Sequence, residues 1–150
     1  MKVFEQLSEL QTCVGEALGV GEWMTIDQQR IDLFAEVTHD HQWIHVDPER
    51  AAAGPYGTTV AHGFLTLSLL PALCASAFGV SNIRMGVNYG LNRVRFPAPV
   101  AAGSRIRAAC RLLEYTPLEN GAQLTVEATV ECEGSTKPVC VAEMVSRRYG

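Results

Sequence analysis

Residues 61–78 read AHGFLTLSLLPALCASAF, a strongly apolar run in a chain of 150 residues. No Asp, Glu, Lys or Arg occurs from Ala51 to Ile83. Leucine and phenylalanine fall on nearly every side of a helix drawn through the run, and such a helix is normally buried by its neighbours. The run therefore predicts a long central helix from about His62 to Phe78, wrapped by a sheet.

A membrane-spanning helix is the alternative interpretation of the same run. A span needs about 20 predominantly apolar residues and is often flanked by basic ones. This run has no basic flank at its start, and the rest of the chain reads as strands. Polar or helix-breaking residues also interrupt it, namely His62, Gly63, Thr66, Ser68, Pro71 and Ser76. These features favour a helix buried within a folded domain.

Strand patterns fill the sequence after the run. Candidate strands lie at about 84–89, 92–96, 104–114, 123–133 and 138–147. Apolar residues alternate most clearly between Val126 and Cys132, and residues 118–121 and 133–137 have the composition of hairpin turns. One long buried helix followed by an antiparallel meander predicts an α+β fold.

Shorter elements are predicted before the run. Residues 20–26 alternate as a first strand, and helical spacing over 28–38 predicts a helix with Asp27 as its N-cap. Asp47 followed by Pro48 is a typical helix start, which predicts a short helix to about Ala53. Residues 1–19 are weakly amphipathic and are consistent with a short surface helix.

Length and charge restrict the classes of function. At 150 residues and 47% hydrophobic, the chain fits a single domain over 1–150. The net charge of −4 and the scattered basic residues argue against a nucleic-acid or membrane partner. One region is locally basic and could meet a phosphorylated ligand, although arginines that alternate along strands more often form a solvated face. Its members are Arg93, Arg95, Arg105, Arg107 and Arg111.

The five cysteines include no C-x-x-C pair. Their odd number, the apolar neighbours and the lack of a signal peptide predict reduced thiols in a cytoplasmic protein. The histidines lack metal-site spacing. His39, His41 and His45 could share an ion with Asp40, but no further ligands support this, so we expect no metal.

Asp40, His45 and Gly63 carry the strongest functional hypothesis. Asp40 and His45 are five residues apart on an expected loop, where the backbone can turn both side chains onto one point. A histidine can take a proton from water, and a carboxylate can hold its tautomer or pass a proton. If a helix begins near Val60, the Gly63 amide can receive an oxygen that gains negative charge. The alternative is that Asp40 and His45 only cap helices and fill a polar corner.

These residues resemble the MaoC-like dehydratases, which include the (R)-specific enoyl-CoA hydratases, and especially their nodulation-protein-N-like branch. The matching residues are Asp40-His41-Gln42-Trp43-Ile44-His45, followed by Ala61-His62-Gly63. Gln42 and Trp43 stand where the family pattern has asparagine and proline. A second block, NYGLNRVRFPAPV at 88–100, extends the resemblance over roughly 20–147.

The resemblance implies a hot-dog fold, in which a curved sheet is rolled around the central helix. It also implies reversible hydration of a 2-enoyl thioester of coenzyme A or acyl carrier protein to the (R)-3-hydroxyacyl thioester, as in fatty acid metabolism. No cofactor is then expected, and at least a homodimer is. Thioester hydrolysis and non-catalytic binding of an acyl thioester are the alternatives.

Each site residue has an expected role. Asp40 and His45 are the acid and base, and the Gly63 amide is the oxyanion site. His39 and His41 are expected to be exposed. Trp43 packs along the substrate channel if it shares an extended face with His45, or else belongs to the core, and His62 has a structural role beside the reacting amide. The expected substrate-binding residues are Gln42, Trp43, His62, Arg93 and Arg95.

Overall fold

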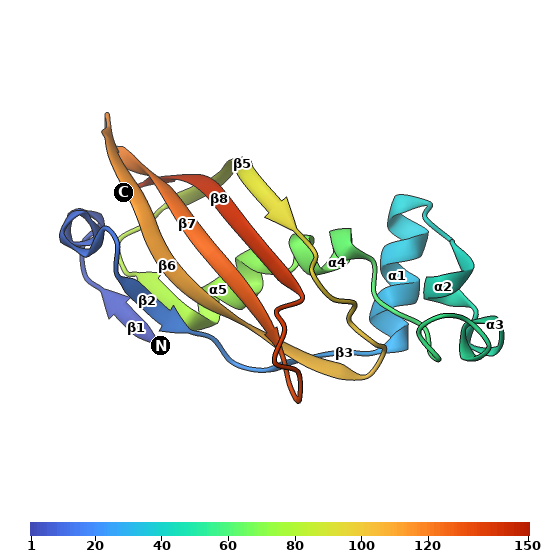
Figure 1. The fold of residues 1–150 in the computed structure, drawn as a ribbon. Helices are drawn as coiled ribbons and strands as arrows, with labels where there is room; N and C mark the ends of the chain where they lie inside the picture. Colours follow the sequence, from blue (N-terminus) through green and yellow to red (C-terminus); the bar gives the residue numbers. More distant parts are fainter.

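The computed structural model describes residues 1–150 and is built around a curved antiparallel sheet (Figure 1). Neighbouring strands follow the order β2-β6-β7-β8-β5, and β3 also pairs with β6. The strand bounds are β2 Ala17–Val20, β3 Met24–Ile26, β5 Met85–Arg95, β6 Ser104–Leu118, β7 Gly121–Cys132 and β8 Cys140–Tyr149. Strands β6, β7 and β8 form the predicted meander, with turns at both predicted places. The α+β class is confirmed.

The apolar run lies against the concave face of this sheet as two consecutive helices, α4 (Gly63–Ser68) and α5 (Leu70–Ala77). The prediction of one unbroken helix from His62 to Phe78 is therefore wrong in detail. Pro71, which has no N–H to donate, occupies the first turn of α5, where such a donor is not needed. Phe78 begins the short strand β4 (Phe78–Val80), which pairs in parallel with β1 (Lys2–Phe4).

The core forms between the two helices and the inner face of the sheet. Leu70, Leu73 and Cys74 of α5 are fully or almost fully buried. They share one cluster of 26 buried apolar residues with alternate residues of β6 and β7, such as Leu112 and Val126. The sheet covers only one side of this helical segment, because Phe64 is 67% exposed and Pro71 and Ala72 are also exposed, so the expectation that the sheet wraps the whole helix is wrong in part.

The edges of the sheet differ from the prediction. The two strands expected at 84–89 and 92–96 are one strand, β5, with irregular pairing near Asn88 and near Leu91. It pairs with β8 at the far edge of the sheet and not with the next strand in sequence. The expected first strand at 20–26 is divided into β2 and β3, and residues 1–19 hold β1, the start of β2 and a 3-10 helix at Leu7–Cys13.

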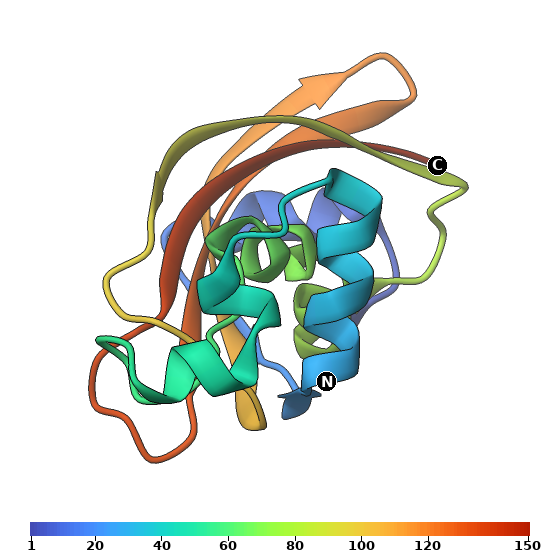
Figure 2. The same cartoon turned by 90° about the vertical axis from the view of Figure 1, so that its right-hand side faces the viewer.

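Three further helices gather at one end of the sheet: α1 (Gln28–Thr38), α2 (Trp43–Val46) and α3 (Pro48–Ala52) (Figure 2). Both predicted N-caps are present, because the Asp27 and Asp47 side chains accept hydrogen bonds from the Arg30 and Arg50 amides. The longest helix has 11 residues, and no helix has the length and apolarity needed to cross a membrane.

Candidate active site

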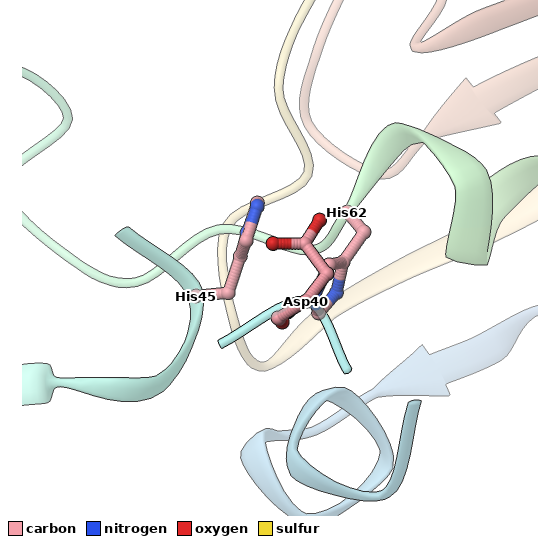
Figure 3. Close-up of side chains that lie close together, drawn as sticks. All are labelled: Asp40, His45 and His62. Carbon is pink, nitrogen blue, oxygen red and sulfur yellow. The ribbon is translucent and has the colours of Figure 1, made fainter. Parts of the chain in front are cut away.

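Three polar side chains converge where the helical end meets the start of α4 (Figure 3). Asp40 lies on the segment between α1 and α2, His45 on α2, and His62 immediately before α4. A carboxylate oxygen of Asp40 and one ring nitrogen of each histidine all lie within 4.8 Å of one another. The left-handed residue His39 ends α1 (φ 60°) and turns the chain toward this point. The expected convergence of Asp40 and His45 is therefore present.

The backbone and side chain of His45 are both held by hydrogen bonds. Instead of the expected loop, the chain forms the helical turn α2 here, and the His45 side chain is buried. Its Nδ1 lies 2.6 Å from the carbonyl oxygen of Val60. Gln28 Nε2 donates to the His45 carbonyl at 2.8 Å, and Gln28 Oε1 accepts from the buried Thr59 hydroxyl at 2.5 Å. The imidazole is thus fixed before any substrate arrives.

The hydrogen bonds also fix the tautomers of the two histidines. His45 Nδ1 faces the Val60 carbonyl, and His62 Nε2 lies 2.9 Å from the Asp40 carbonyl. Carbonyl oxygens only accept, so both of these nitrogens carry protons. In the neutral rings the lone pairs are then on His45 Nε2 and His62 Nδ1. The buried Nδ1 of His62 has no hydrogen-bond partner in the structure.

Burial lowers the pKa of His45 from its ordinary value of 6.5. The hydrogen bond to Val60 raises this pKa, neighbouring His62 lowers it and Asp40 raises it, but burial is the largest effect. The ring is consequently neutral at physiological pH, with a free lone pair on Nε2. A neutral imidazole with one committed and one free nitrogen is suited to accept a proton from water.

His62 stacks on His45, with ring centroids 3.8 Å apart and planes inclined by 22°. Phe34 packs on His62 with centroids 4.9 Å apart. A histidine binds a metal through a lone pair in the plane of its ring, so two ligands must have planes that meet at the ion. Because these two rings are almost parallel, their geometry suits a supporting stack better than a shared metal ion.

Gly63 is the first residue of α4 and brings the start of that helix to the site. The Leu65 and Thr66 amides donate to the His62 carbonyl, so the earlier amides of Gly63 and Phe64 have no partner inside the helix. A Cβ added at Gly63 would lie 3.0 Å from the Phe96 ring. Because glycine has no Cβ, the start of α4 can pack against Phe96, the residue that follows β5.

A hollow of about 350 Å³ joins His45 to Gly63. Its lining is mainly apolar and includes Tyr56 and Phe96. The remaining lining residues are Ile44, Val60, Ala61, Thr66, Pro97, Ala98, Pro99, Val100 and Val139. A molecule in this hollow would contact both the buried His45 imidazole and the start of α4.

Gln42 and Trp43 lie away from this hollow. Gln42 is the exposed N-cap of α2. The Arg50 guanidinium lies 4.4 Å from the Trp43 ring centre, and a Cβ added at Gly54 would come within 2.9 Å of that ring. The condition for Trp43 to line the substrate channel, an extended face shared with His45, is not met, because both residues lie on a helical turn and Trp43 packs against the α3 region.

The arginines predicted as a basic region divide into two groups. Arg105 and Arg107 form ion pairs with Glu133 and Glu131 across the outer face of the sheet, and Arg111 donates to the Gly15 carbonyl. These three belong to a solvated face. Arg93 and Arg95 instead line a hollow of about 360 Å³ with Glu127, Glu143, Val141 and Pro97. That hollow shares only Pro97 with the one at His45.

Sequence reasoning did not identify several residues that shape the site. The Val60 carbonyl sets the His45 tautomer, and Gln28 and Thr59 hold α2 in place. Tyr56 is not among the residues expected at the site, and Phe96 is expected only as the end of a strand. A backbone carbonyl and a remote glutamine leave no local sequence signal, whereas the uncharged segment that follows Ala51, next to the histidine block, is a signal that could have suggested Tyr56.

A family model described as MaoC like domain matches residues 9–135. The chain is 55% identical to the 3-hydroxyacyl-thioester dehydratase Z of Mycobacterium tuberculosis, over 98% of each protein. It is 50% identical to nodulation protein N of Rhizobium leguminosarum bv. viciae, over 93% of this chain and 89% of that protein. The solved (R)-hydratase of A. caviae superimposes with a TM-score of 0.70 at 19% identity, covering 89% of this chain and 94% of the other.

Proposed function

The chain belongs to the MaoC-like domain family, and we propose that it reversibly hydrates a 2-enoyl thioester of coenzyme A to the (R)-3-hydroxyacyl thioester. It has the hot-dog fold of that family. It is a lyase of the hydratase and dehydratase class, acting on acyl thioesters. The carrier, the stereochemistry and the residues below are the parts that we propose.

The observation that supports the proposal is the free Nε2 of a neutral, rigidly held His45 in a hollow that also contains the Gly63 helix start. Hydration of an enoyl thioester needs a base near the β-carbon and positive polarisation at the thioester oxygen. His45 and Gly63 line one hollow, and the Asp40 carboxylate lies within reach of the imidazole, which supports these two roles.

In the proposed reaction the thioester oxygen accepts a hydrogen bond from the Gly63 amide. A water held between Asp40 and His45 gives one proton to His45 Nε2 as its oxygen bonds to the β-carbon. The electron pair of the double bond moves toward the carbonyl, and the enolate oxygen is stabilised by the positive end of the helix. The α-carbon then takes the proton that the water gave up, either from His45 or after transfer from His45 to Asp40, which completes the addition of H and OH.

Water and proton reach the double bond from the face where Asp40 and His45 lie, so the addition is syn. The (R) configuration of the product is proposed from the similarity to the (R)-hydratases. No cofactor takes part, because the side chains and water move every proton.

The test is hydration of crotonyl-CoA and of longer and branched 2-enoyl-CoAs by the purified protein. We expect loss of the absorbance of the conjugated enoyl thioester, without release of free thiol. Thiol release without hydration would indicate a hydrolase, and no change with any substrate would contradict the proposal. NMR of the product formed in D₂O reads the relative configuration at the α and β carbons, where anti addition would contradict the mechanism. Chiral chromatography of the 3-hydroxy acid reads the absolute configuration, where an (S) product would contradict the proposal.

A further inference from the structure

Two further hollows lie beyond the His45 hollow, between the helices α4 and α5 and the strands β5 and β8, and share no lining residue with it. The first has a volume of about 390 Å³ and is lined by Leu67, Ser68, Pro71, Asn88, Tyr89, Gly90, Leu91, Met144 and Val145. The second has about 300 Å³ and is lined by Pro71, Cys74, Ile83, Gly86, Val87, Asn88, Met144, Ser146 and Arg148. Because three residues are common to both, the hollows form one groove.

The helical residues along the groove form a single row. Gly63 lines the His45 hollow, Leu67 and Pro71 the next, and Pro71 and Cys74 the last. Their spacing of four, four and three residues places these four on one side of the helical segment. At a rise of about 1.5 Å per residue, Gly63 and Cys74 are roughly 16 Å apart. The row thus runs from Gly63 at the proposed site to Cys74, which lines the same hollow as Arg148.

Arg148 is a partly buried cation without a partner. It takes part in none of the three ion pairs of the structure, and its side chain makes no hydrogen bond. The Phe78 ring lies 5.4 Å from its guanidinium, and its other close neighbours are the thiols of Cys74 and Cys110. Burial lowers the pKa of Arg148, and the two cysteines raise it. A desolvated charge in such surroundings is costly unless an anion comes to it.

The space next to Arg148 is kept open by its partner residue on β5. Gly86 is paired with Arg148 in the sheet, and a Cβ built on Gly86 would meet nothing within 4 Å. The preceding residue, Arg147, is satisfied on the other face of the strand: it donates to Gln123 at 3.0 Å and lies 3.7 Å over the Tyr89 ring. Of the two neighbouring arginines, only Arg148 therefore presents an unused charge to a hollow.

We propose that Arg148 binds a carboxylate at the far end of the acyl chain, so that long 2-enoyl thioesters ending in a carboxylate are accepted as substrates. This inference rests on the proposed hydratase function. The apolar first hollow suits methylene groups, and the arginine fork matches a carboxylate. At roughly 1.3 Å of advance per carbon, from bonds of about 1.5 Å in a zigzag, a chain of about a dozen carbons covers the distance.

The experiment compares kcat/KM for a twelve-carbon 2-enoyl-CoA ending in a methyl group with that for its counterpart ending in a carboxylate. We expect the wild-type enzyme to use both. Arg148→Met should lower kcat/KM for the carboxylate substrate about tenfold or more through KM, the scale of a lost charge-assisted hydrogen bond. The methyl-ended substrate and crotonyl-CoA should be unaffected, and Arg148→Lys should recover part of the loss. Arg147→Met is the matched control and should leave kcat/KM for both substrates unchanged.

A phosphate of the carrier is the other anion that could reach Arg148. N-acetylcysteamine thioesters lack phosphate, so the same dependence on Arg148 with these substrates assigns the carboxylate. If Arg148→Met instead lowers kcat/KM for both coenzyme A substrates and for neither N-acetylcysteamine thioester, the arginine binds the carrier and the inference is wrong. The wild-type enzyme alone provides a further test. If its kcat/KM were tenfold lower for the carboxylate-ended than for the methyl-ended substrate at every chain length, the inference would be overturned.

The failures of the two proposals can be distinguished. If no thioester is hydrated, crotonyl-CoA included, the proposed function is contradicted. Calorimetric titration with two saturated twelve-carbon acyl-CoAs, one ending in a methyl group and one in a carboxylate, then tests the inference by itself. Tighter binding of the carboxylate-ended thioester that is lost in Arg148→Met supports it, and equal affinities overturn it.

Discussion

His45 and Asp40 differ in how the surrounding structure holds them. His45 is buried, bonded through Nδ1 and stacked on His62, whereas Asp40 is exposed and its carboxylate makes only a long contact of 3.4 Å with the Gln42 amide. Replacement of His45 should therefore disturb folding as well as chemistry. Asp40 is the cleaner position at which to test the proposed acid–base pair.

Asp40→Asn should reduce kcat for hydration by about 10²-fold, the usual scale for removing a positioned acid or base, and should leave thermal stability unchanged. The expected constancy of Tm follows from the exposure of Asp40. Asp47→Asn is the control, since Asp47 caps α3 and asparagine caps about as well. Wild-type turnover in Asp40→Asn, measured with crotonyl-CoA, would show that the assigned role is wrong.

The hydration rate should have an acid limb with a midpoint below pH 6.5, the ordinary histidine pKa, because burial lowers the pKa of His45. The base form is the active one, so kcat/KM falls as the pH falls through the folded-state pKa. His62→Gln should move the midpoint upward, because His62 lowers the pKa of His45 and a glutamine carries no charge. The glutamine can still donate to the Asp40 carbonyl.

The pH profiles of wild type and His62→Gln check this directly, and a midpoint that does not move would contradict the assigned coupling.

The same lowered pKa has a consequence for folding. The unfolded chain takes up this proton more readily than the folded one, so His45 contributes a loss of stability as the pH falls below 6.5. Chemical denaturation at several pH values measures this loss.

Among the elements, α4 is the one whose exact placement the chemistry depends on. Its first residue, Gly63, lies against Phe96 so closely that an added methyl group requires movement. The helical turn α2, which carries His45, is held in place by the hydrogen bonds of Gln28 to the His45 carbonyl and the Thr59 hydroxyl. The free amides and the free imidazole nitrogen thus belong to two separately supported elements.

Gly63→Ala should lower kcat by about 10²-fold, the scale for disturbing one oxyanion donor, because the new Cβ would lie 3.0 Å from the Phe96 ring. Phe96→Leu in the same chain should restore part of the activity by making room. Gly79→Ala is the control, since a Cβ there meets nothing within 4 Å. Steady-state kinetics on all four proteins are the measurement; full activity of Gly63→Ala would argue against the amide as the oxyanion donor.

At the level of the whole molecule, β5 is the unusual strand. It pairs with β8 on one side only, and all of its residues except Val94 are exposed. Its exposed apolar side chains include Val87, Tyr89 and Leu91. A long, exposed edge of this kind normally pairs with another chain or is protected by charge. Two copies joined along β5 would extend the sheet and cover the groove beside α4 and α5.

We expect a homodimer by light scattering at micromolar concentration. Val87→Lys combined with Leu91→Lys should give a monomer, because charge on an edge strand opposes pairing. Val37→Lys is the control, since Val37 is an exposed apolar residue on α1, away from β5. A monomeric wild-type protein would contradict the prediction and would leave the groove without a second wall.

The sequence could predict the fold class and much of the site because the relevant signals are local. The apolar run, the alternation in 104–147 and the N-caps Asp27 and Asp47 each depend on residues close together in the chain. The block from Asp40 to His45 and the later Gly63 pointed to the proposed acid, the proposed base and the helix start. The helix break near Leu69 was missed although Pro71 is a local signal for it. The single long strand β5 was missed because it depends on pairing with the distant strand β8.

By itself, the sequence determined which groups are present: a carboxylate, an imidazole and a glycine amide on a chain with enough apolar surface to bury one helical segment. Only the tertiary structure decided their states. The Val60 carbonyl, 15 residues from His45, selects the tautomer, and burial lowers its pKa. The sheet order that puts β5 beside β8 brings Gly86 next to Arg148 and opens the groove. Protonation and desolvation depend on neighbours in space, and local sequence patterns do not record which distant residues become neighbours.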